Sequence, residues 1–272
     1  MKKKRTKELS SEILKMAEGV FGTVIDLSLW YVAYFTSLGI PQKQSGAYWR
    51  AQNNADSFIE SVNYEVIKRG IAEARRRGFV EKKELNKSVP HISQSGTKRL
   101  LSVTPFYKEV RPWNGKMYLV TYDIPEKQRR DRMILYRYLK QIRCARLQDS
   151  LFMTPNNPKD MLSVFVKEHE LGGMIIVSDI GKDGSIGDED VHALIIRVFE
   201  IEKLNKRYDM WLMRVRGKTI DQFSILGFLS ILKDDPQLPY ELLPEWWKGE
   251  EAYEKVKNQL RMVSSRVRSI AS

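Results

Sequence analysis

The sequence predicts an α+β fold built from three units, and three observations lead to this prediction. Residues 63–93 show helical periodicity followed by two short apolar runs around a basic turn. Residues 117–180 alternate between strand-like and helix-like segments, and from residue 201 onward apolar residues recur at helical spacing. We place the three units at residues 1–104, 116–200 and 201–272, with a proline-containing linker at residues 105–115.

The first helical pattern covers residues 8–38 and breaks near Gly19 and Gly22. Its apolar part resembles a membrane anchor in length, but Asp26 lies near the middle, where a charged side chain costs about 3 kcal/mol. We therefore expect a buried helix of a soluble domain and no membrane partner. The single cysteine, Cys144, excludes an intrachain disulfide and, with only three histidines, a Cys/His zinc site. Both features fit a cytoplasmic protein.

A basic amphipathic helix is expected after Asn63, which can cap its first turn. Ile67, Ile71 and Ala74 fall on one face of this helix, and basic residues occupy another. Gly78 supplies the residue that ends it.

Two short strands are expected directly after this helix. The first begins at residues 79–80, a basic run at residues 81–87 forms the turn, and the second lies near residues 91–93. Helix, strand, basic turn and strand in this order are typical of a winged helix. In that arrangement the helix lies in the DNA major groove and the hairpin contacts backbone phosphate.

The cationic side chains of this module are the expected contacts to double-stranded DNA. The helix supplies Lys68, Arg69 and Arg76, with Arg75 and Arg77 as further candidates, and the hairpin supplies Lys82, Lys83 and Lys87. Replacing the three hairpin lysines with alanine should flatten the salt dependence of binding. An exposed helix whose arginines are merely solvated remains the alternative interpretation.

The positive charge of the chain is unevenly distributed. Residues 1–110 contain 19 Lys and Arg against 11 Asp and Glu, and residues 111–180 contain 12 against 8. Residues 181–272 contain 15 of each and are therefore neutral. A clustered excess indicates a surface that faces a polyanion, because neutralising phosphates releases counterions.

The central unit is expected to form a ferredoxin-like βαββαβ sandwich. Its segments read strand, helix, strand, helix and strand over residues 116–124, 125–143, 145–155, 157–169 and 172–180. The remaining strand is expected at residues 192–199. The inner stripe of the first helix is predicted to include Met133, Tyr136 or Arg137, Leu139 or Lys140, and Ile142. For Arg129, Arg130 and Arg132 on this helix, solvation or ion pairs with Asp131 and Glu126 are favoured over DNA contacts.

The last third reads as helices over residues 201–215, 219–235 and 250–270. A proline-punctuated connection at residues 236–249 separates the second of these helices from the third. It contains Trp246 and Trp247, which we expect to join a helix pair by packing.

Three separated stretches resemble the phenylacetate-degradation repressor (PaaX) family of bacterial transcription regulators. They are VIKRGIAEARRRGFVEKK with ISQSGTKRL, then GKMYLVTYDIPEKQRRDRMILYRYLKQIRCARLQDSLFMTP, then ILKDDPQLPYELLPEWWKG. The resemblance implies an aryl-CoA thioester, or another acyl-CoA-type compound, as effector, but no stretch identifies its pocket. The central domain of the family is itself similar to the small ferredoxin-like CRISPR-associated nuclease, which shares the motif YDIPEKQRRDR.

That motif makes Asp123 the one candidate for catalysis or metal binding. A metal-dependent phosphodiesterase needs at least two acidic ligands around its ion, so Asp123 serves only if a symmetric dimer brings two copies together. An aspartate two residues before a proline is more often a turn or cap residue that accepts amide hydrogens from the next helix. We therefore predict that Asp123 holds a turn.

The leading hypothesis is a homodimeric DNA-binding transcription regulator, most simply a repressor, with a possible small-molecule effector and no cofactor. The alternative is a metal-dependent nuclease or CRISPR spacer-acquisition partner that uses Asp123 with Mg²⁺ or Mn²⁺. A nucleic-acid-binding adaptor with neither operator nor effector is a third possibility.

Overall fold

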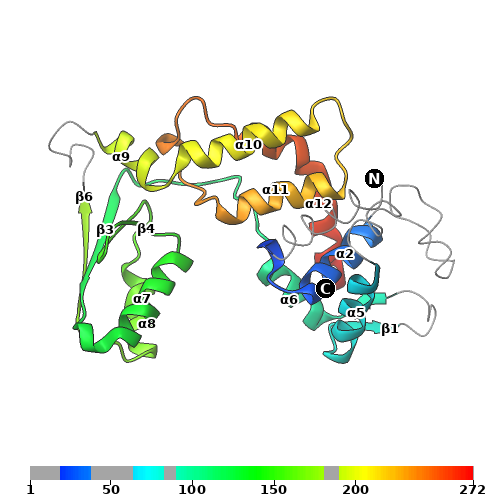
Figure 1. The fold of residues 1–272 in the computed structure, drawn as a ribbon, viewed down its shortest axis with the longest axis horizontal. Coiled ribbons are helices and arrows are strands. Elements are labelled where there is room, and N and C mark those ends of the chain that lie inside the picture. The colour runs from blue at the N-terminus through cyan, green and yellow to red at the C-terminus, as the bar shows by residue number, and fades with distance from the viewer. Residues whose placement is uncertain (1–18, 38–63, 83–89, 181–189, 272) are drawn as a thin grey trace, which may run out of the picture. The chain divides into compact units, whose positions relative to one another are not determined.

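The computed structural model describes residues 19–37, 64–82, 90–180 and 190–271 (Figure 1). These residues form two compact units, each of which combines distant parts of the chain. The first unit gathers the described residues up to Tyr107 with residues 207–234 and the residues from Lys248 onward. The second unit joins residues 108–206 to residues 235–247. Both contain strands and helices, which confirms the α+β class.

The first unit is mainly helical. Its elements are α2 (Val24–Ser37), α5 (Tyr64–Arg76), β1 (Val80–Lys82), β2 (Pro90–Ile92), α6 (Gln94–Val103), the second half of α10 (Ile201–Val215), α11 (Gln222–Asp234) and α12 (Gly249–Ala271). The predicted break in the first helical pattern is confirmed, because Gly22 has φ +75° and α2 starts just after it. The predicted helices at residues 201–215, 219–235 and 250–270 are present with small shifts at their ends.

Helix α2 is the central element of this unit, and α5, α6, β2 and α12 all pack against it. Consequently almost every described side chain of α2 is buried, including Leu27, Leu29 and Trp30. The predicted buried helix is thus confirmed. Among the described residues, every helix is too short or too polar to cross a membrane.

Aromatic side chains join the C-terminal helices to one another within the same unit. Phe228 of α11 contacts Tyr208 and Trp211 of α10 and Tyr253 of α12, with ring centroids 5.6–6.4 Å apart. Tyr253 in turn stacks on Tyr107 at 3.8 Å. The C-terminal helices therefore share a core with the N-terminal part of the chain. The three predicted domain boundaries remain predictions from the sequence.

The second unit contains a four-stranded antiparallel sheet. Its elements are β3 (Met117–Asp123), the 3-10 turn η1 (Glu126–Gln128), α7 (Arg129–Gln141), β4 (Ala145–Gln148), β5 (Leu151–Thr154), α8 (Lys159–Glu168), β6 (Met174–Ile180), α9 (Val191–Val198), the first part of α10 and the 3-10 turn η2 (Tyr240–Leu242). The strand order is β4-β5-β3-β6. The expected βαββαβ succession is therefore present.

Two details of the predicted succession were wrong. Residues 145–155 form two strands instead of one, because Asp149 and Ser150 make the turn of a tight hairpin. Residues 192–199 are helical, in α9, instead of forming the last strand. Asp190 caps α9 by accepting a hydrogen bond from the Ala193 amide at 2.7 Å. The β4–β5 hairpin supplies the fourth strand, so none is needed from α9.

Helices α7 and α8 cover one face of the sheet (Figure 1). Tyr138 of α7 stacks on Phe165 of α8 at 3.6 Å, which places the two helices side by side. The inner stripe of α7 is centred on Leu135 and Leu139, both fully buried, whereas the predicted Met133 is 43% exposed. The stripe prediction was therefore wrong at Met133 and right at Leu139.

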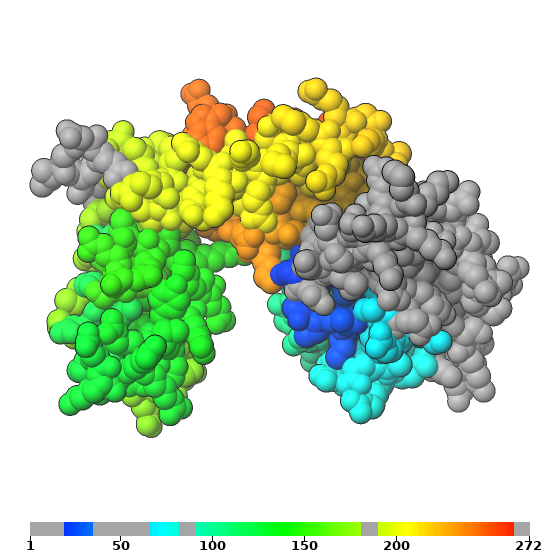
Figure 2. Space-filling view, viewed as in Figure 1, coloured from blue at the N-terminus to red at the C-terminus, as the bar shows by residue number. Residues whose placement is uncertain are grey.

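The core beneath these helices contains Cys144, which is buried and unbonded to any other cysteine, as expected for a packing residue. Burial raises the pKa of its thiol to about 12, and a hydrogen bond with Thr154 offsets only part of that effect. In Figure 2 the green atoms of this unit fill the space that the ribbon leaves open between its strands and helices.

The segment at residues 235–247 packs against the start of the same unit. The guanidinium of Arg111 is buried, where it donates to the Lys108 and Leu238 carbonyls at 3.0 and 3.2 Å and lies over the Tyr240 ring. The Gln237 side-chain oxygen accepts a hydrogen bond from the Lys108 amide at 2.7 Å. Residues far apart in sequence are thereby joined by polar contacts.

Candidate nucleic-acid interface

Helix α5 is held against α2 by an unusually close backbone approach. A Cβ at Gly70 would lie 2.1 Å from Ser28 Oγ and 2.9 Å from the Val24 carbonyl oxygen, so only glycine fits at this crossing. Ser28 Oγ donates to the Val24 carbonyl at 2.8 Å and lies 3.4 Å from the carbonyl of Ile67 on α5. The inner face of α5 is completed by Ala74, which is fully buried. The orientation of α5 is therefore fixed by packing.

The opposite face of α5 is cationic and exposed. As predicted, Ile67 and Ala74 are buried, while Ile71 is half-buried. All five basic residues that the sequence assigned to this element are exposed: Lys68, Arg69, Arg75, Arg76 and Arg77. The structure thus brings these five predicted residues together on one outward surface.

Glu73 modifies this surface, and the sequence analysis did not identify it as a site residue. Arg76 donates to its carboxylate at 2.9 Å and Arg77 at 2.8 Å. These hydrogen bonds, that from Arg76 first, hold the pKa of Glu73 below its usual value, and the same contact raises the pKa of Arg76. The i, i+3 and i, i+4 spacings were the available signal for both pairs. Arg76 and Arg77 therefore have an acidic neighbour.

The chain leaves α5 through a Schellman motif centred on Gly78. Its φ is +73°, the Phe79 amide donates to the Ala74 carbonyl at 2.8 Å, and the Gly78 amide donates to the Arg75 carbonyl at 3.0 Å. These two hydrogen bonds end the helix, and the chain continues directly into β1. The predicted helix end at Gly78 is confirmed.

The base of the β1–β2 hairpin is fastened by the start of α6. The Ser93 hydroxyl donates to the Gly78 carbonyl and accepts a hydrogen bond from the Gly96 amide at 3.1 Å. Ser95 also donates to the Gly78 carbonyl, at 2.9 Å. A Cβ at Gly96 would lie 2.1 Å from the Phe79 carbonyl oxygen, so the two segments touch closely. Helix α6 was not predicted, although Ser93 is a typical N-cap residue.

The hairpin pairs antiparallel with Val80 opposite Ile92, and both side chains are buried. The two predicted strands are therefore confirmed. Lys83 and Lys87 lie outside the described residues, as does the side chain of Lys82 at the end of β1. Their assignment to DNA phosphate remains a prediction.

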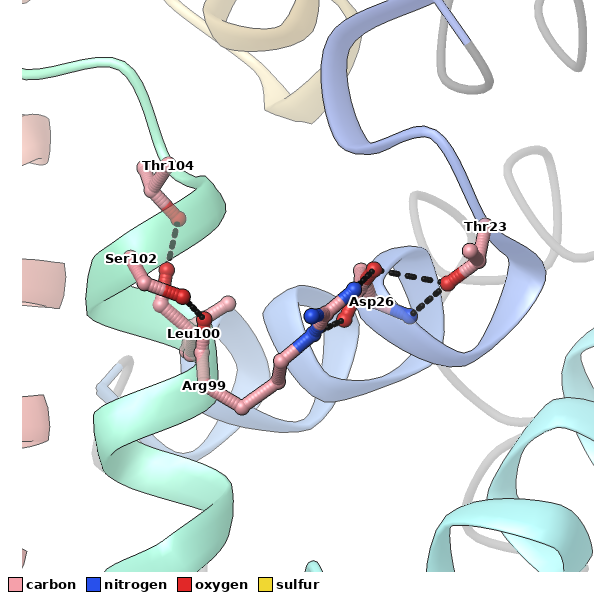
Figure 3. Close-up of polar contacts among 6 residues, drawn as sticks. All are labelled: Thr23, Asp26, Arg99, Leu100, Ser102 and Thr104. Atoms are coloured by element: carbon pink, nitrogen blue, oxygen red, sulfur yellow. Dashed lines mark hydrogen bonds and ion pairs between the residues drawn. The ribbon is translucent and has the colours of Figure 1, made fainter. Parts of the chain in front are cut away.

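An ion pair between exposed Arg99 and buried Asp26 connects α2 to α6 (Figure 3). Arg99 Nε donates to Asp26 Oδ1 at 2.8 Å, and Nη2 donates to Oδ2 at 2.7 Å. Thr23 Oγ1 donates to the same carboxylate at 2.7 Å and accepts the Asp26 amide hydrogen. Asp26 is fully buried, and its hydrogen bonds raise the pKa of Arg99. Helix α5 packs on α2, and the base of the hairpin is hydrogen-bonded to the start of α6. The ion pair therefore links the two helices that position α5 and the hairpin.

Asp123 is exposed at the end of β3, opposite Met174 in the register with β6. The prediction that Asp123 holds a turn stays a prediction. Asp123 caps neither of the two elements that follow it, because neither η1 nor α7 has a side-chain cap. The reason is that η1 intervenes and α7 begins only at Arg129, six residues further along the chain. Within the described ranges no three His, Cys, Asp or Glu side chains gather where they could hold a metal ion.

The second unit also contains a cavity of about 550 Å³ beside the ends of β3 and β6. Its lining combines aromatic, apolar and acidic groups: Trp113, Gly115, Met117, Ile180, Asp190, Val191, His192, Ile195, Glu241 and Leu242. Two of these described residues are carboxylates and none is a lysine or arginine. The acyl-CoA-type effector implied by the resemblance remains a prediction.

Comparison with known proteins agrees with the central part of the sequence analysis. Residues 110–190 match the family model described as the PaaX protein central Cas2-like domain, which confirms the stated resemblance for this region. A solved structure with a similar fold is the uncharacterized protein Rv0674 from Mycobacterium tuberculosis, with a TM-score of 0.56 and 14% sequence identity. The alignment covers 92% of this chain and 100% of that one. No curated protein is significantly similar to the chain.

Proposed function

We propose that this chain is a PaaX-type DNA-binding transcription regulator that docks a winged helix on duplex DNA. The observation that carries the proposal is the outward cationic face of α5, followed at once by a hairpin whose base is fixed by Gly78 and Ser93. A helix held rigidly by its inner face can present basic side chains to a DNA groove with little loss of entropy. The match to the PaaX central domain supports the regulator class.

Lys68, Arg69 and Arg75 are the residues on which the proposal depends most. They are exposed, and they lie opposite the packing face of α5 formed by Ile67, Gly70 and Ala74. Replacing them with alanine should therefore leave the fold intact. Three lost contacts of about 1 kcal/mol each correspond to a fall in affinity of about 100-fold.

The test is DNase footprinting and fluorescence anisotropy with the full chain on duplex DNA from the region upstream of its own gene. We expect a discrete footprint, and about 100-fold weaker binding by the triple variant Lys68→Ala, Arg69→Ala, Arg75→Ala. A charge-matched control is the triple variant Arg214→Ala, Arg216→Ala, Lys218→Ala, which removes three exposed cations elsewhere in the same unit. Equal affinities of the two triple variants would refute the proposal.

The proposal includes a homodimer and repression in the absence of an effector. A two-fold symmetric dimer should protect two half-sites one or more helical turns apart, because operator symmetry follows protein symmetry. Deleting the gene should raise transcription from the protected promoter.

Incubation of the protein and DNA with Mg²⁺ or Mn²⁺ tests the nuclease alternative. DNA cleavage that Asp123→Ala abolishes would replace the regulator assignment with a nuclease assignment.

A further inference from the structure

A second strongly basic element lies in the sheet-bearing unit, on α7 and the turn that leads into it. Residues 126–141 contain six Lys and Arg and two Asp and Glu. The remainder of residues 111–180 contains six of each, so the entire positive excess of that stretch is concentrated in residues 126–141. These basic residues are separate from the interface on α5, because α5 belongs to the other unit.

Four of the five cationic side chains of α7 face away from the protein core, and the fifth, Arg132, is half-buried. Leu135 and Leu139 are fully buried and define the inner face. At about 100° per residue, Arg130 and Arg137 lie on the opposite side of the helix. Arg129 and Lys140 flank them, and all four are exposed. We call these four residues the α7 ridge, which extends over about 15 Å.

Among the described side chains, the ridge residues lack acidic partners, whereas three other cations of the same unit have one. Lys116 pairs with Asp179 at 2.6 Å, Arg146 pairs with Asp149, and Lys203 pairs with Glu200 at 3.3 Å. In the part of the chain that the structure describes, no ion pair joins a ridge residue to a carboxylate. Unneutralised charges this close together repel one another, so a polyanion that binds them is stabilised by relief of that repulsion.

The composition of the ridge identifies the kind of polyanion. Single-stranded nucleic acid is usually bound by aromatic side chains that stack on bases, but both tyrosines of α7 are engaged inward, Tyr136 against Phe152 and Tyr138 against Phe165. A membrane surface requires several large apolar side chains beside the charges, whereas the ridge has only Met133 among its described neighbours on that face. Guanidinium groups match phosphate oxygens in bidentate geometry.

We propose that the α7 ridge is a second binding surface for the sugar–phosphate backbone of duplex DNA, without base recognition. The proposal rests on the proposed function, because it adds sequence-independent contacts to those of the winged helix. Three or four phosphate contacts would add about 3 to the salt dependence, expressed as the slope of log K against log salt. The ridge would thus strengthen binding to any duplex.

The experiment measures binding of the full chain to a labelled 30-base-pair duplex of arbitrary sequence over a range of salt concentrations. The ridge variant is Arg130→Ala, Arg137→Ala, Lys140→Ala, and the control is Arg214→Ala, Arg216→Ala, Lys218→Ala. We expect the ridge variant to bind at least 10-fold more weakly than the control at low salt. The plot of log K against log salt should be less steep for the ridge variant than for the control, by about 2–3 in the magnitude of its slope.

A ridge variant with the affinity and slope of the control overturns the inference. The proposed function survives that result if the α5 triple variant still loses the footprint, and both fail if the unaltered chain binds no duplex. Binding of the same variants to single-stranded RNA and to anionic vesicles of phosphatidylserine is measured in parallel. Ridge-dependent binding to either one that is tighter than binding to duplex DNA would also overturn the assignment.

Discussion

The ion pair between Asp26 and Arg99 provides the sharpest prediction about the fold that supports the interface. Among the described residues, Arg99→Ala leaves a fully buried carboxylate whose remaining hydrogen-bond donor is the Thr23 hydroxyl. Removing one partner of a fully buried pair costs about 3–5 kcal/mol. Because 43% of the Arg99 side chain is exposed, water can replace part of the lost contact. We therefore expect a loss of about 2–3 kcal/mol in the free energy of unfolding.

The assay is urea unfolding followed by circular dichroism, arranged as a double-mutant cycle with Asp26→Ala, Arg99→Ala and both together. We expect a coupling energy of about 2 kcal/mol between the two residues. Faster hydrogen exchange in α2 and α6 should locate the effect in the first unit. The control is Arg76→Ala, because its pair with Glu73 is 78% exposed on the arginine side, where solvent screens the interaction and little stability should be lost. Equal losses for Arg99→Ala and Arg76→Ala, or a coupling near zero, would refute the reasoning.

Three further predictions follow from contacts in the structure. Gly70→Ala should lower the free energy of unfolding by about 1–3 kcal/mol in the same urea assay, because the new methyl group meets Ser28 Oγ and the backbone of α2; unchanged stability would show that the helices do not touch there. Glu73→Gln removes the negative charge beside Arg76 and should tighten DNA binding several-fold in an anisotropy titration; weaker binding by a folded variant would contradict this. Burial raises the pKa of the Cys144 thiol to about 12, so at pH 8 it stays protonated and should react with Ellman's reagent only after unfolding; rapid reaction of the folded protein would show that the thiol is accessible.

Local patterns in the sequence predicted the central unit well but missed its hairpin. The alternation of strand and helix located β3, α7, α8 and β6, because each buries one face at its own characteristic period. The β4–β5 hairpin was missed because its turn is only two residues long, so residues 145–155 read as one continuous strand. Helix α9 was read as a strand, although Val191, Leu194, Ile195 and Val198 have helical spacing.

Features that depend on tertiary contacts could not be predicted from local sequence patterns. Nothing local shows that the C-terminal helices pack with the N-terminal part of the chain, since that requires contacts such as Tyr107 with Tyr253. The partner of Asp26 is 73 residues away in sequence, so the ion pair had no local signal. The basic residues Lys68 to Arg76 could be grouped from the sequence because a single helix carries them, and the structure shows all of them exposed.

The most direct test of the central claim is the salt dependence of operator binding by the α5 variant Lys68→Ala, Arg69→Ala, Arg75→Ala. The magnitude of the slope of log K against log salt should decrease by about 2–3 relative to the unaltered chain, since each lost phosphate contact contributes about 0.9. A variant that folds normally and keeps both the affinity and the slope of the unaltered chain would show that α5 does not face DNA.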